Sequence, residues 1–334
     1  MVKLNNAITD VPGIKVGHAQ DLHDLTGCTV ILAEKGAVGG VDQRGGAPGT
    51  RETDLLKPVN LVEKVHAVML AGGSAFGLDA ASGAMQYLKE KKIGLNTGYG
   101  KVPIVPAAIL FDLSLGNRDA YPDAKMGAQA CENASTRPPE QGTVGAGTGA
   151  TVGKILSPAQ ATKGGIGTAS MEIGGGIIIG AIMAVNAFGD VVDPLNGAIL
   201  AGARTVHKGP VKVGKHEIFA DSMEVMKGMI GRTALGAASS ANTVIGVVAT
   251  NAKLNKPQAT KAAQMAQNGI ARAIRPAHTL LDGDTIFVLA SGEKKADPST
   301  VGAFAAEVIS QAIVNAVMKA SSAGGIPAAS DLLR

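Results

Sequence analysis

The chain has 334 residues, of which 45 are glycine and only 3% are aromatic, and it contains no tryptophan. Its 31 lysines and arginines against 27 acidic residues give a formal charge of +4, and the basic residues are dispersed. Dispersed charge argues against a nucleic-acid-binding surface, and two cysteines (Cys28 and Cys131) argue against a disulfide framework. The first ten residues lack an apolar signal core, and the longest uncharged stretch, 173–189, is interrupted by glycines. We therefore expect a cytoplasmic protein without a membrane or nucleic-acid partner.

Short segments rich in valine, isoleucine and threonine predict strands, several of them apolar on both faces. They are residues 26–33, 65–71, 151–156, 177–185, 243–250 and 285–290. Helical periodicity is clearest after Ser74, which is expected to cap that helix, and over 257–274 and 298–320. Strands gather in the middle and long helices lie near both ends, which favours an α+β fold with two stacked sheets between helices.

No linker divides the chain, so residues 1–334 are predicted to form a single domain. Residues 207–241 are the least regular, and they predict an exposed, cleavable or mobile connection. The six histidines are scattered, so neither a metal site nor a cofactor is predicted.

Two glycine-rich segments leave a nucleotide- or anion-binding protein without hydrolytic activity as an alternative. In GTVGAGTGATVGK, the residues Gly145, Gly147 and Ala150 fit G-x-G-x-x-A, but no strand precedes them and no helix follows. In LAGGSAFGLDAASG, from Leu70, a turn between strand and helix presents backbone N–H groups to an anion or simply packs closely. A non-catalytic oligomeric scaffold is a second alternative.

The candidate chemistry lies in SANTVIGVVAT, where Asn242 and Thr243 stand directly before an apolar, β-branched run. A threonine hydroxyl is a weak nucleophile unless a base lies beside it. The simplest base is the threonine's own α-amine, whose reference pKa is ~7.7–8.0. That amine exists only if the Asn242–Thr243 bond is cut, and otherwise Thr243 is a turn residue that caps a strand.

Eight motifs, in order along nearly the whole chain, carry a resemblance to a known family. They are ITDVPGIKVGHA, GGVDQRGGAPGTRETDLL, LAGGSAFGLDAASG, FDLSLGNRDAYPDA, GTGATVGK, AVNAFGDVVD, NTVIGVVATNA and HTLLDGDTIF. With them the chain resembles the DmpA-like self-processing hydrolases, which include L-aminopeptidase/D-esterases, β-peptidyl aminopeptidases and the nylon-oligomer (6-aminohexanoate) endohydrolase. The resemblance implies a four-layer α/β/β/α sandwich of the N-terminal nucleophile hydrolase type and a homo-oligomer, by family habit a tetramer.

The resemblance also implies that the precursor cuts itself between Asn242 and Thr243. The products are an α chain of 1–242 and a β chain of 243–334, with Thr243 as the N-terminal nucleophile. The expected substrate is a small peptide or another small-molecule amide, such as a linear oligoamide, attacked without a cofactor.

Five further residues receive roles from the same resemblance. Asn186 polarises the scissile carbonyl and stabilises the oxyanion, Lys154 lies against the nucleophile, Asp282 and Asp284 orient its hydroxyl and amine, and Tyr121 lines the pocket. From the residues alone, a structural alternative stays open for each position. The two aspartates could form an exposed turn, Asn186 and Lys154 could belong to ordinary strand-ending turns, and Tyr121 could lead into a helix.

One position departs from the family pattern. The aminopeptidases carry a glutamate that binds the substrate's free amino group, and Ala107 stands there in this chain. An internal amide of an oligoamide or of an ω-amino acid oligomer therefore competes with an N-terminal peptide bond as the substrate.

Overall fold

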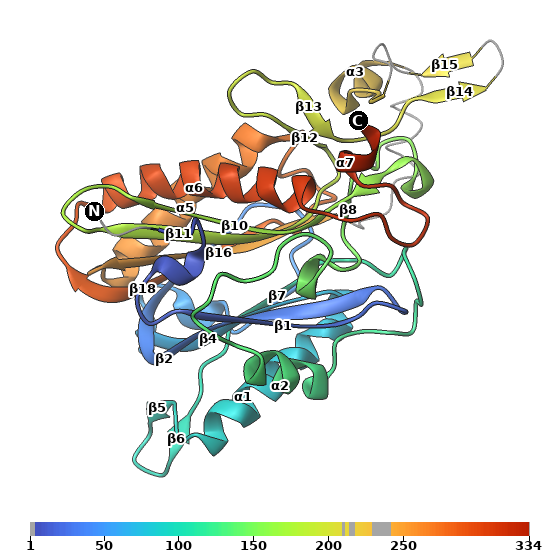
Figure 1. Cartoon of the computed structure of the whole chain (residues 1–334). Helices are drawn as coiled ribbons and strands as arrows, with labels where there is room; N and C mark the ends of the chain where they lie inside the picture. The colour runs from blue at the N-terminus through green and yellow to red at the C-terminus, as the bar shows by residue number, and fades with distance from the viewer. Residues whose placement is uncertain (1–3, 209–210, 214–217, 229–241, 334) are drawn as a thin grey trace.

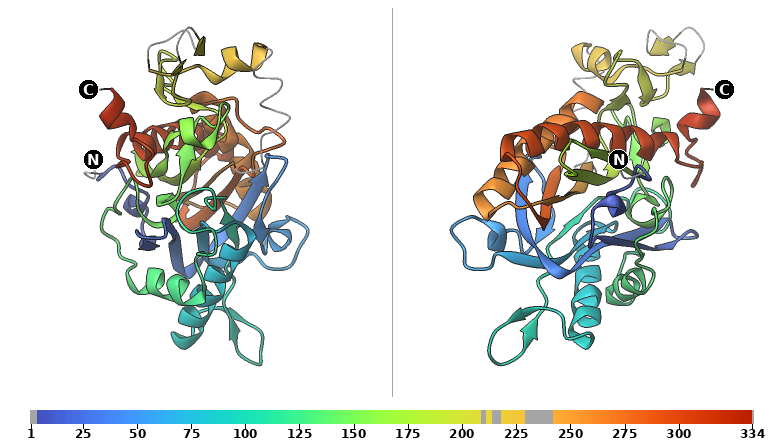
Figure 2. Two further views of the ribbon diagram at one scale, coloured as in Figure 1. Left: turned by 90° about the vertical axis from the view of Figure 1, so that its right-hand side faces the viewer. Right: turned by 60° about the vertical axis from the view of Figure 1, so that its left-hand side comes forward.

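The fold has four layers, which Figure 1 shows from the side. The structure is a computed structural model and describes residues 4–208, 211–213, 218–228 and 242–333. Helices α5 and α6 cover one sheet layer, a second sheet layer lies beneath it, and α1 and α2 cover the opposite face (Figure 1). The two further views in Figure 2 show the same stacking. The predicted α+β sandwich with two sheets between helices is confirmed.

Both sheet layers belong to one hydrogen-bonded array of nine strands. Its order is β10-β11-β16-β18-β2-β4-β7-β3, with β1 paired to β2. The strands are β1 (Lys15–Asp21), β2 (Thr26–Gln43), β3 (Thr50–Arg51), β4 (Lys64–Ala71), β7 (Ala107–Ile109), β10 (Gly165–Glu172), β11 (Ile178–Asn186), β16 (Thr243–Ala252) and β18 (Thr285–Lys294).

Strand β2 joins the two layers because it changes partners along its length. Residues 28–32, 37 and 38 pair with β4, whereas residues 38–43 pair with β18. The register with β4 shifts between Leu32 and Ala37, and Gly36 in that interval has φ of 77°, a conformation that favours glycine. A strand over 26–33 was predicted, but β2 continues for ten residues beyond Ala33, because its second half pairs with a different layer.

Apolar side chains fill all three spaces between the layers. Neighbouring residues of a strand point to opposite faces, so Val247 packs between the sheets and Val248 packs under α5 and α6. Phe287 joins Val247 between the sheets, while Met69 and Leu88 belong to the core beside α1 and α2. Burial on both faces explains why residues 244–249 of β16 form a continuous run without polar side chains instead of alternating.

Six α-helices are described: α1 (Ala80–Glu90), α2 (Ala124–Glu132), α3 (Ser222–Lys227), α5 (Lys256–Ala273), α6 (Pro298–Met318) and α7 (Ala329–Leu332). The predicted helices over 257–274 and 298–320 correspond to α5 and α6. Among the described residues α6 alone is long and apolar enough to cross a membrane, but 61% of its most apolar window is buried inside the protein. A core helix that packs beside α5 on the sheet meets the same length and hydropathy criteria.

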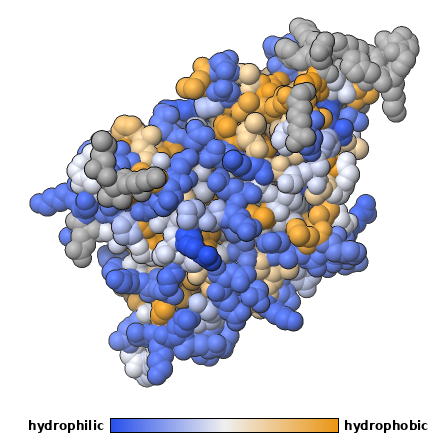
Figure 3. Space-filling model, viewed as in Figure 1, coloured by the Kyte–Doolittle hydropathy of each residue, from blue (hydrophilic) through white to orange (hydrophobic). Residues whose placement is uncertain are grey.

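Shorter elements surround this core. Small sheets are formed by β12 (Asp190–Val192) with β13 (Ile199–Ala201) and β17 (Ile274–Arg275), β14 (Val206–Lys208) with β15 (Val211–Val213), β5 (Leu95–Asn96) with β6 (Lys101–Val102), and β8 (Thr151–Val152) with β9 (Thr162–Lys163). The 3-10 helices are Ile8–Asp10, Asp54–Leu56, Ser74–Asp79, Gly145–Gly147 and Pro158–Gln160. In Figure 3 the face seen in Figure 1 is mostly hydrophilic, with apolar side chains gathered near β12 and β13.

Three local predictions need correction. Ser74 does not cap α1: it has φ of 54° in a 3-10 helix, and α1 begins at Ala80. The strand predicted over 151–156 is only β8, because Gly153 has φ of 71°, which ends the extended run. The connection predicted over 207–241 contains β15, α3 and part of β14, and residues 229–241 lie outside the described part of the chain.

Candidate active site

The ends of four strands meet along one edge of the sheet layer that α5 and α6 cover, and the directions of the strands explain why. β16 and β18 run parallel, so both strands begin at this edge. β11 is antiparallel to β16 and β2 is antiparallel to β18, so these two strands end there. The edge therefore collects Thr243 at the start of β16, Asn186 at the end of β11 and the turn before β18 that holds Asp282 and Asp284.

Thr243 and the carbonyl group before it lie at the centre of this edge. Asn242 and Thr243 are both buried, and the Thr243 hydroxyl donates a hydrogen bond to the carbonyl oxygen of Asn242. The backbone N–H of Gly283 donates to the same oxygen at 3.0 Å. A Cβ built on Gly283 would lie 3.0 Å from Thr243 Oγ1, so the turn approaches the hydroxyl closely. The carbonyl group of Asn242 thus lies between a hydroxyl and a backbone donor.

Asn186 lies directly across from Thr243 in the antiparallel ladder. Its Oδ1 accepts hydrogen bonds from Lys154 Nζ at 2.7 Å and from the Thr151 N–H at 3.0 Å, while its Nδ2 donates to the Phe111 carbonyl at 2.9 Å. Lys154 Nζ also donates to the Asn186 carbonyl at 3.0 Å. The lysine therefore fixes the amide of the residue that pairs with Thr243.

The two predicted carboxylates are held by the turn that contains them. Asp282 Oδ2 accepts from the N–H and the hydroxyl of Thr279 at 2.9 and 2.6 Å. Asp284 Oδ1 accepts from the Val244 N–H at 2.8 Å, and its Oδ2 accepts from the ring Nδ1 of His278 at 2.8 Å. Asp284 thus holds the residue that follows Thr243, and Asp282 braces the turn.

Burial shifts the pKa values of two groups at this edge toward neutrality. Burial lowers the pKa of Lys154 to about 7, against the opposing charges of Asp282 and Asp112. Burial and the charge of Asp284 raise the pKa of Asp282 to about 6, against hydrogen bonds from Thr279 and Phe188. Groups with such values exchange protons readily near pH 7, as acid–base chemistry requires.

Lys163 and Asp112 are buried beside this site, and the sequence analysis gave neither of them a role. Lys163 is fully buried and donates to the Ala150 carbonyl at 2.6 Å. Burial lowers its pKa to about 7, and the charge of Asp112 opposes that shift. Asp112 in turn accepts from the Gly73 N–H at 2.6 Å and from the Thr26 hydroxyl at 2.9 Å. No sequence motif marks a lysine that lies in a core.

This lowered pKa predicts how stability depends on pH. Between pH 7 and about 10 the unfolded chain binds a proton at Lys163 that the folded chain has lost, so stability rises with pH. Lys163→Met removes this contribution and leaves the Ala150 carbonyl with the Gly164 N–H, 2.9 Å away. We expect the stability of the wild type relative to the variant to rise by up to about 1.4 kcal/mol per pH unit. Urea unfolding of both proteins at pH 7, 8, 9 and 10 measures this, and parallel curves would contradict it.

Tyr121 lies further out than the other predicted residues. Its side chain is half-exposed and stacks on Phe76, with ring centroids 5.4 Å apart. Gly73 lies against it, since a Cβ on Gly73 would come within 2.5 Å of Tyr121 Cβ. The Gly73 N–H donates to Asp112. Asp112 directly follows Phe111, and the Phe111 carbonyl accepts a hydrogen bond from Asn186. Tyr121 is thus connected to the site through this segment, in a position open to a substrate.

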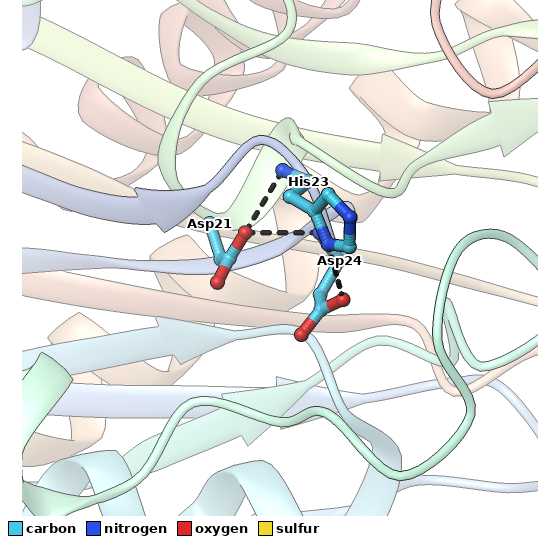
Figure 4. Close-up of side chains that lie close together, drawn as sticks. All are labelled: Asp21, His23 and Asp24. Atoms are coloured by element: carbon cyan, nitrogen blue, oxygen red, sulfur yellow. Dashed lines mark hydrogen bonds and ion pairs between the residues drawn. The ribbon is translucent and has the colours of Figure 1, made fainter.

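Other candidate groups serve local structure. Gly73, in the turn considered as an anion site, gives its N–H to Asp112. Within the described residues, one group of side chains has metal-ligand spacing: Asp21, His23 and Asp24 (Figure 4). Asp21 Oδ1 accepts from the backbone N–H groups of His23 and Asp24 at 2.8 and 2.9 Å, which is the hydrogen bonding of a turn.

Comparison with solved structures gives the class of fold. The structure matches the L-aminopeptidase D-Ala-esterase/amidase of Ochrobactrum anthropi, described as a variant of the Ntn hydrolase fold, with a TM-score of 0.70 and 20% identity. That match covers 96% of this chain and 88% of the other. A β-aminopeptidase of a Burkholderia species matches with a TM-score of 0.69 and 22% identity, over 100% of this chain and 94% of the other. The fold is therefore the N-terminal nucleophile hydrolase fold of the DmpA-like type.

Comparison of sequences gives the family. Residues 6–329 match the model of peptidase family S58, and the chain belongs to this family. An uncharacterized aminopeptidase of Mycobacterium leprae (strain TN) is 42% identical, over 96% of this chain and 92% of that protein. A 6-aminohexanoate-oligomer endohydrolase of Paenarthrobacter ureafaciens is 30% identical, over 92% of this chain and 84% of that protein. The protein is a hydrolase of amide bonds, and the non-hydrolytic nucleotide- or anion-binding alternative is not supported.

Proposed function

We propose that the chain cuts itself between Asn242 and Thr243 and then uses Thr243 as an N-terminal nucleophile to hydrolyse amide bonds. The products are an α chain of 1–242 and a β chain of 243–334. One observation carries the proposal: the Thr243 hydroxyl contacts the carbonyl oxygen of Asn242, and the Gly283 N–H donates to that oxygen from 3.0 Å. A nucleophile and a donor for a developing negative charge thus meet at one peptide bond.

Self-cleavage follows from this arrangement in three balanced steps. Thr243 Oγ1 attacks the Asn242 carbonyl carbon, and the hydroxyl proton of Thr243 passes to a nearby base. The carbonyl oxygen of Asn242 becomes an oxyanion that faces the Gly283 N–H. The C–N bond then breaks, the nitrogen gains a proton, and an ester joins Asn242 to Thr243. Water hydrolyses the ester, which leaves a carboxyl group on Asn242 and a free amine and hydroxyl on Thr243. Lys154 and Asp282 are the candidate proton carriers, because the α-amine does not yet exist.

Turnover repeats the chemistry on an external amide. The new α-amine of Thr243 takes the hydroxyl proton while Oγ1 attacks the substrate carbonyl, and it returns the proton to the departing amine. Water then hydrolyses the acyl-enzyme. Lys154 and Thr151 hold Asn186 Oδ1, which supports a role for Asn186 in stabilising the oxyanion. The half-exposed Tyr121 and its partner Phe76 are placed to contact the substrate.

The proposed substrates are short peptides and linear oligoamides. The names of the relatives cover both classes of substrate: one is named an uncharacterized aminopeptidase and another a 6-aminohexanoate-oligomer endohydrolase. Ala107 is buried in β7 and offers no carboxylate for a free amino group. This favours substrates that are cut at an internal amide, although the higher identity is with a protein named as an aminopeptidase. The homo-oligomer and the cytoplasmic location expected from the sequence stay predictions.

Intact-mass spectrometry of freshly purified protein tests the proposal, followed by a panel of amino-acid p-nitroanilides, dipeptides and 6-aminohexanoate oligomers. We expect two masses that sum to the precursor plus one water, with the smaller chain beginning at Thr243, and hydrolysis of at least one panel member. A single mass after prolonged incubation, together with no hydrolysis across the panel, would overturn the proposal.

A further inference from the structure

His278 contacts Asp284 twice and has an unusual backbone. Its ring Nδ1 lies 2.8 Å from Asp284 Oδ2, and its backbone N–H donates to the same oxygen at 3.1 Å. Its φ is 57°, in the left-handed region that a residue with a side chain seldom adopts. Such a conformation costs on the order of 1 kcal/mol and persists where the surroundings demand it.

Asp284 connects His278 to the nucleophile. Its other oxygen, Oδ1, accepts the Val244 N–H at 2.8 Å, and Val244 follows Thr243 directly. Asp284 is almost fully buried, so water does not compete freely for its oxygens. Its carboxylate therefore lies between the His278 ring and the first residues of β16, and rotation of that carboxylate would release the Val244 N–H.

The chemistry of the pair assigns the proton on the ring. An ionised carboxylate only accepts hydrogen bonds, so Nδ1 carries the hydrogen that faces Asp284. The other ring nitrogen, Nε2, is buried and makes no hydrogen bond to any described residue. Within the described part of the chain, the contact with Asp284 is thus the only hydrogen bond of the ring. This argues that the ring serves to hold the Asp284 carboxylate.

We propose that His278 is a positioning residue: its Nδ1–H fixes the Asp284 carboxylate, and through Val244 it holds the Thr243 hydroxyl at its target. The inference rests on the proposed function. A displacement of about 1 Å at a reacting atom can cost on the order of 100-fold in rate. The same support is needed for self-cleavage and for turnover, because Thr243 is the nucleophile in both.

Two substitutions separate donation from packing, since glycine and asparagine both tolerate a left-handed backbone. His278→Gly removes the donor, whereas His278→Asn keeps an N–H group close to the position of Nδ1. For the Gly variant we expect self-cleavage and kcat to fall by about 10- to 100-fold with KM within about twofold, the range of a misplaced nucleophile. For the Asn variant we expect both rates within about fivefold of the wild type.

The experiment measures the self-cleavage rate by intact mass, kcat and KM on the panel substrate that the wild type hydrolyses, and hydrogen exchange at the Val244 amide. We expect exchange to accelerate in the Gly variant and stay slow in the Asn variant, a change that lost ring packing alone would not produce. A Gly variant at wild-type rates, or Gly and Asn variants that are equally slow, would overturn the inference.

A variant that does not fold and a wild type without activity each have a defined interpretation. If the Gly variant does not fold, His278→Asp replaces it, because aspartate has the shape of asparagine without the donor; equal rates in the Asn and Asp variants would then overturn the inference. If the wild type itself neither cuts nor hydrolyses, the proposed function fails, and the inference fails with it. If the wild type is active and the His278 variants have the same rates as the wild type, the inference fails but the proposed function stands.

Discussion

A Thr243→Ala variant is expected to remain one chain of 334 residues and to lose hydrolysis by at least about 1,000-fold. The substitution removes the oxygen that attacks the Asn242 carbonyl in maturation and the substrate carbonyl in turnover. Thr243 is the buried first residue of β16, and its backbone pairing with Asn186 does not involve the side chain. The fold should therefore persist, and circular dichroism together with the melting temperature checks that point.

The matched control for this variant is Thr243→Ser, which keeps the hydroxyl and removes only a methyl group. We expect the serine variant to mature and to hydrolyse the same substrate, within about tenfold of the wild type, because the nucleophile is retained. An alanine variant that still splits between residues 242 and 243 would show that another group attacks the bond. An intact serine variant would show that the methyl group is needed to place the oxygen.

The sequence predicts the central strands well for a physical reason. β4, β11 and β16 are buried on both faces, so these strands begin and end close to the predicted limits. β18 begins at the predicted Thr285, but it continues past the predicted end at Ala290 to Lys294, where the chain is no longer apolar or fully buried. β2 was predicted too short because its second half, EKGAVGGVDQ, is not a continuous apolar run. That half is a strand because β18 pairs with it, and pairing partners distant in sequence leave no local signal.

The site was only partly predictable. Family resemblance supplied Thr243, Asn186, Lys154, Asp282 and Asp284, and the structure brings all five to one edge of a sheet. Their spacing of up to 130 residues in the chain does not imply this meeting, which depends on β16 running parallel to β18 and antiparallel to β11.

The groups that the sequence analysis missed share one property: their environment, not their residue type, gives them importance. Gly283 contributes a backbone N–H, which every residue except proline has. Lys163 has no motif and is distinguished only by complete burial. His278 stands in the motif HTLLDGDTIF, so a signal was present, but its contact with Asp284 depends on a left-handed backbone conformation that the sequence does not predict for histidine.

Lys154→Met is expected to slow self-cleavage and kcat by up to about 100- to 1,000-fold, which is the loss when an oxyanion-hole donor itself is removed. Lys154 Nζ and the Thr151 N–H both donate to Asn186 Oδ1, and this fixes the orientation of the amide, whose Nδ2 donates to the Phe111 carbonyl. Without Nζ the amide loses the shortest of these hydrogen bonds that fix its orientation, while the contacts with Thr151 and Phe111 remain. Intact-mass spectra of samples quenched at successive times measure the rate of self-cleavage, and steady-state kinetics measure kcat.

Lys163→Met is the matched control for this effect. Both lysines are buried, and burial lowers the pKa of each to about 7, but Lys163 donates to the Ala150 carbonyl. If the contact with Asn186 is what matters, the Lys163 variant should keep at least about a tenth of wild-type kcat, a loss of no more than about 1.4 kcal/mol in transition-state stabilisation. Equal losses in the two variants would instead assign the effect to the buried positive charge near Asp112, because both lysines interact with that carboxylate whereas only Lys154 contacts Asn186.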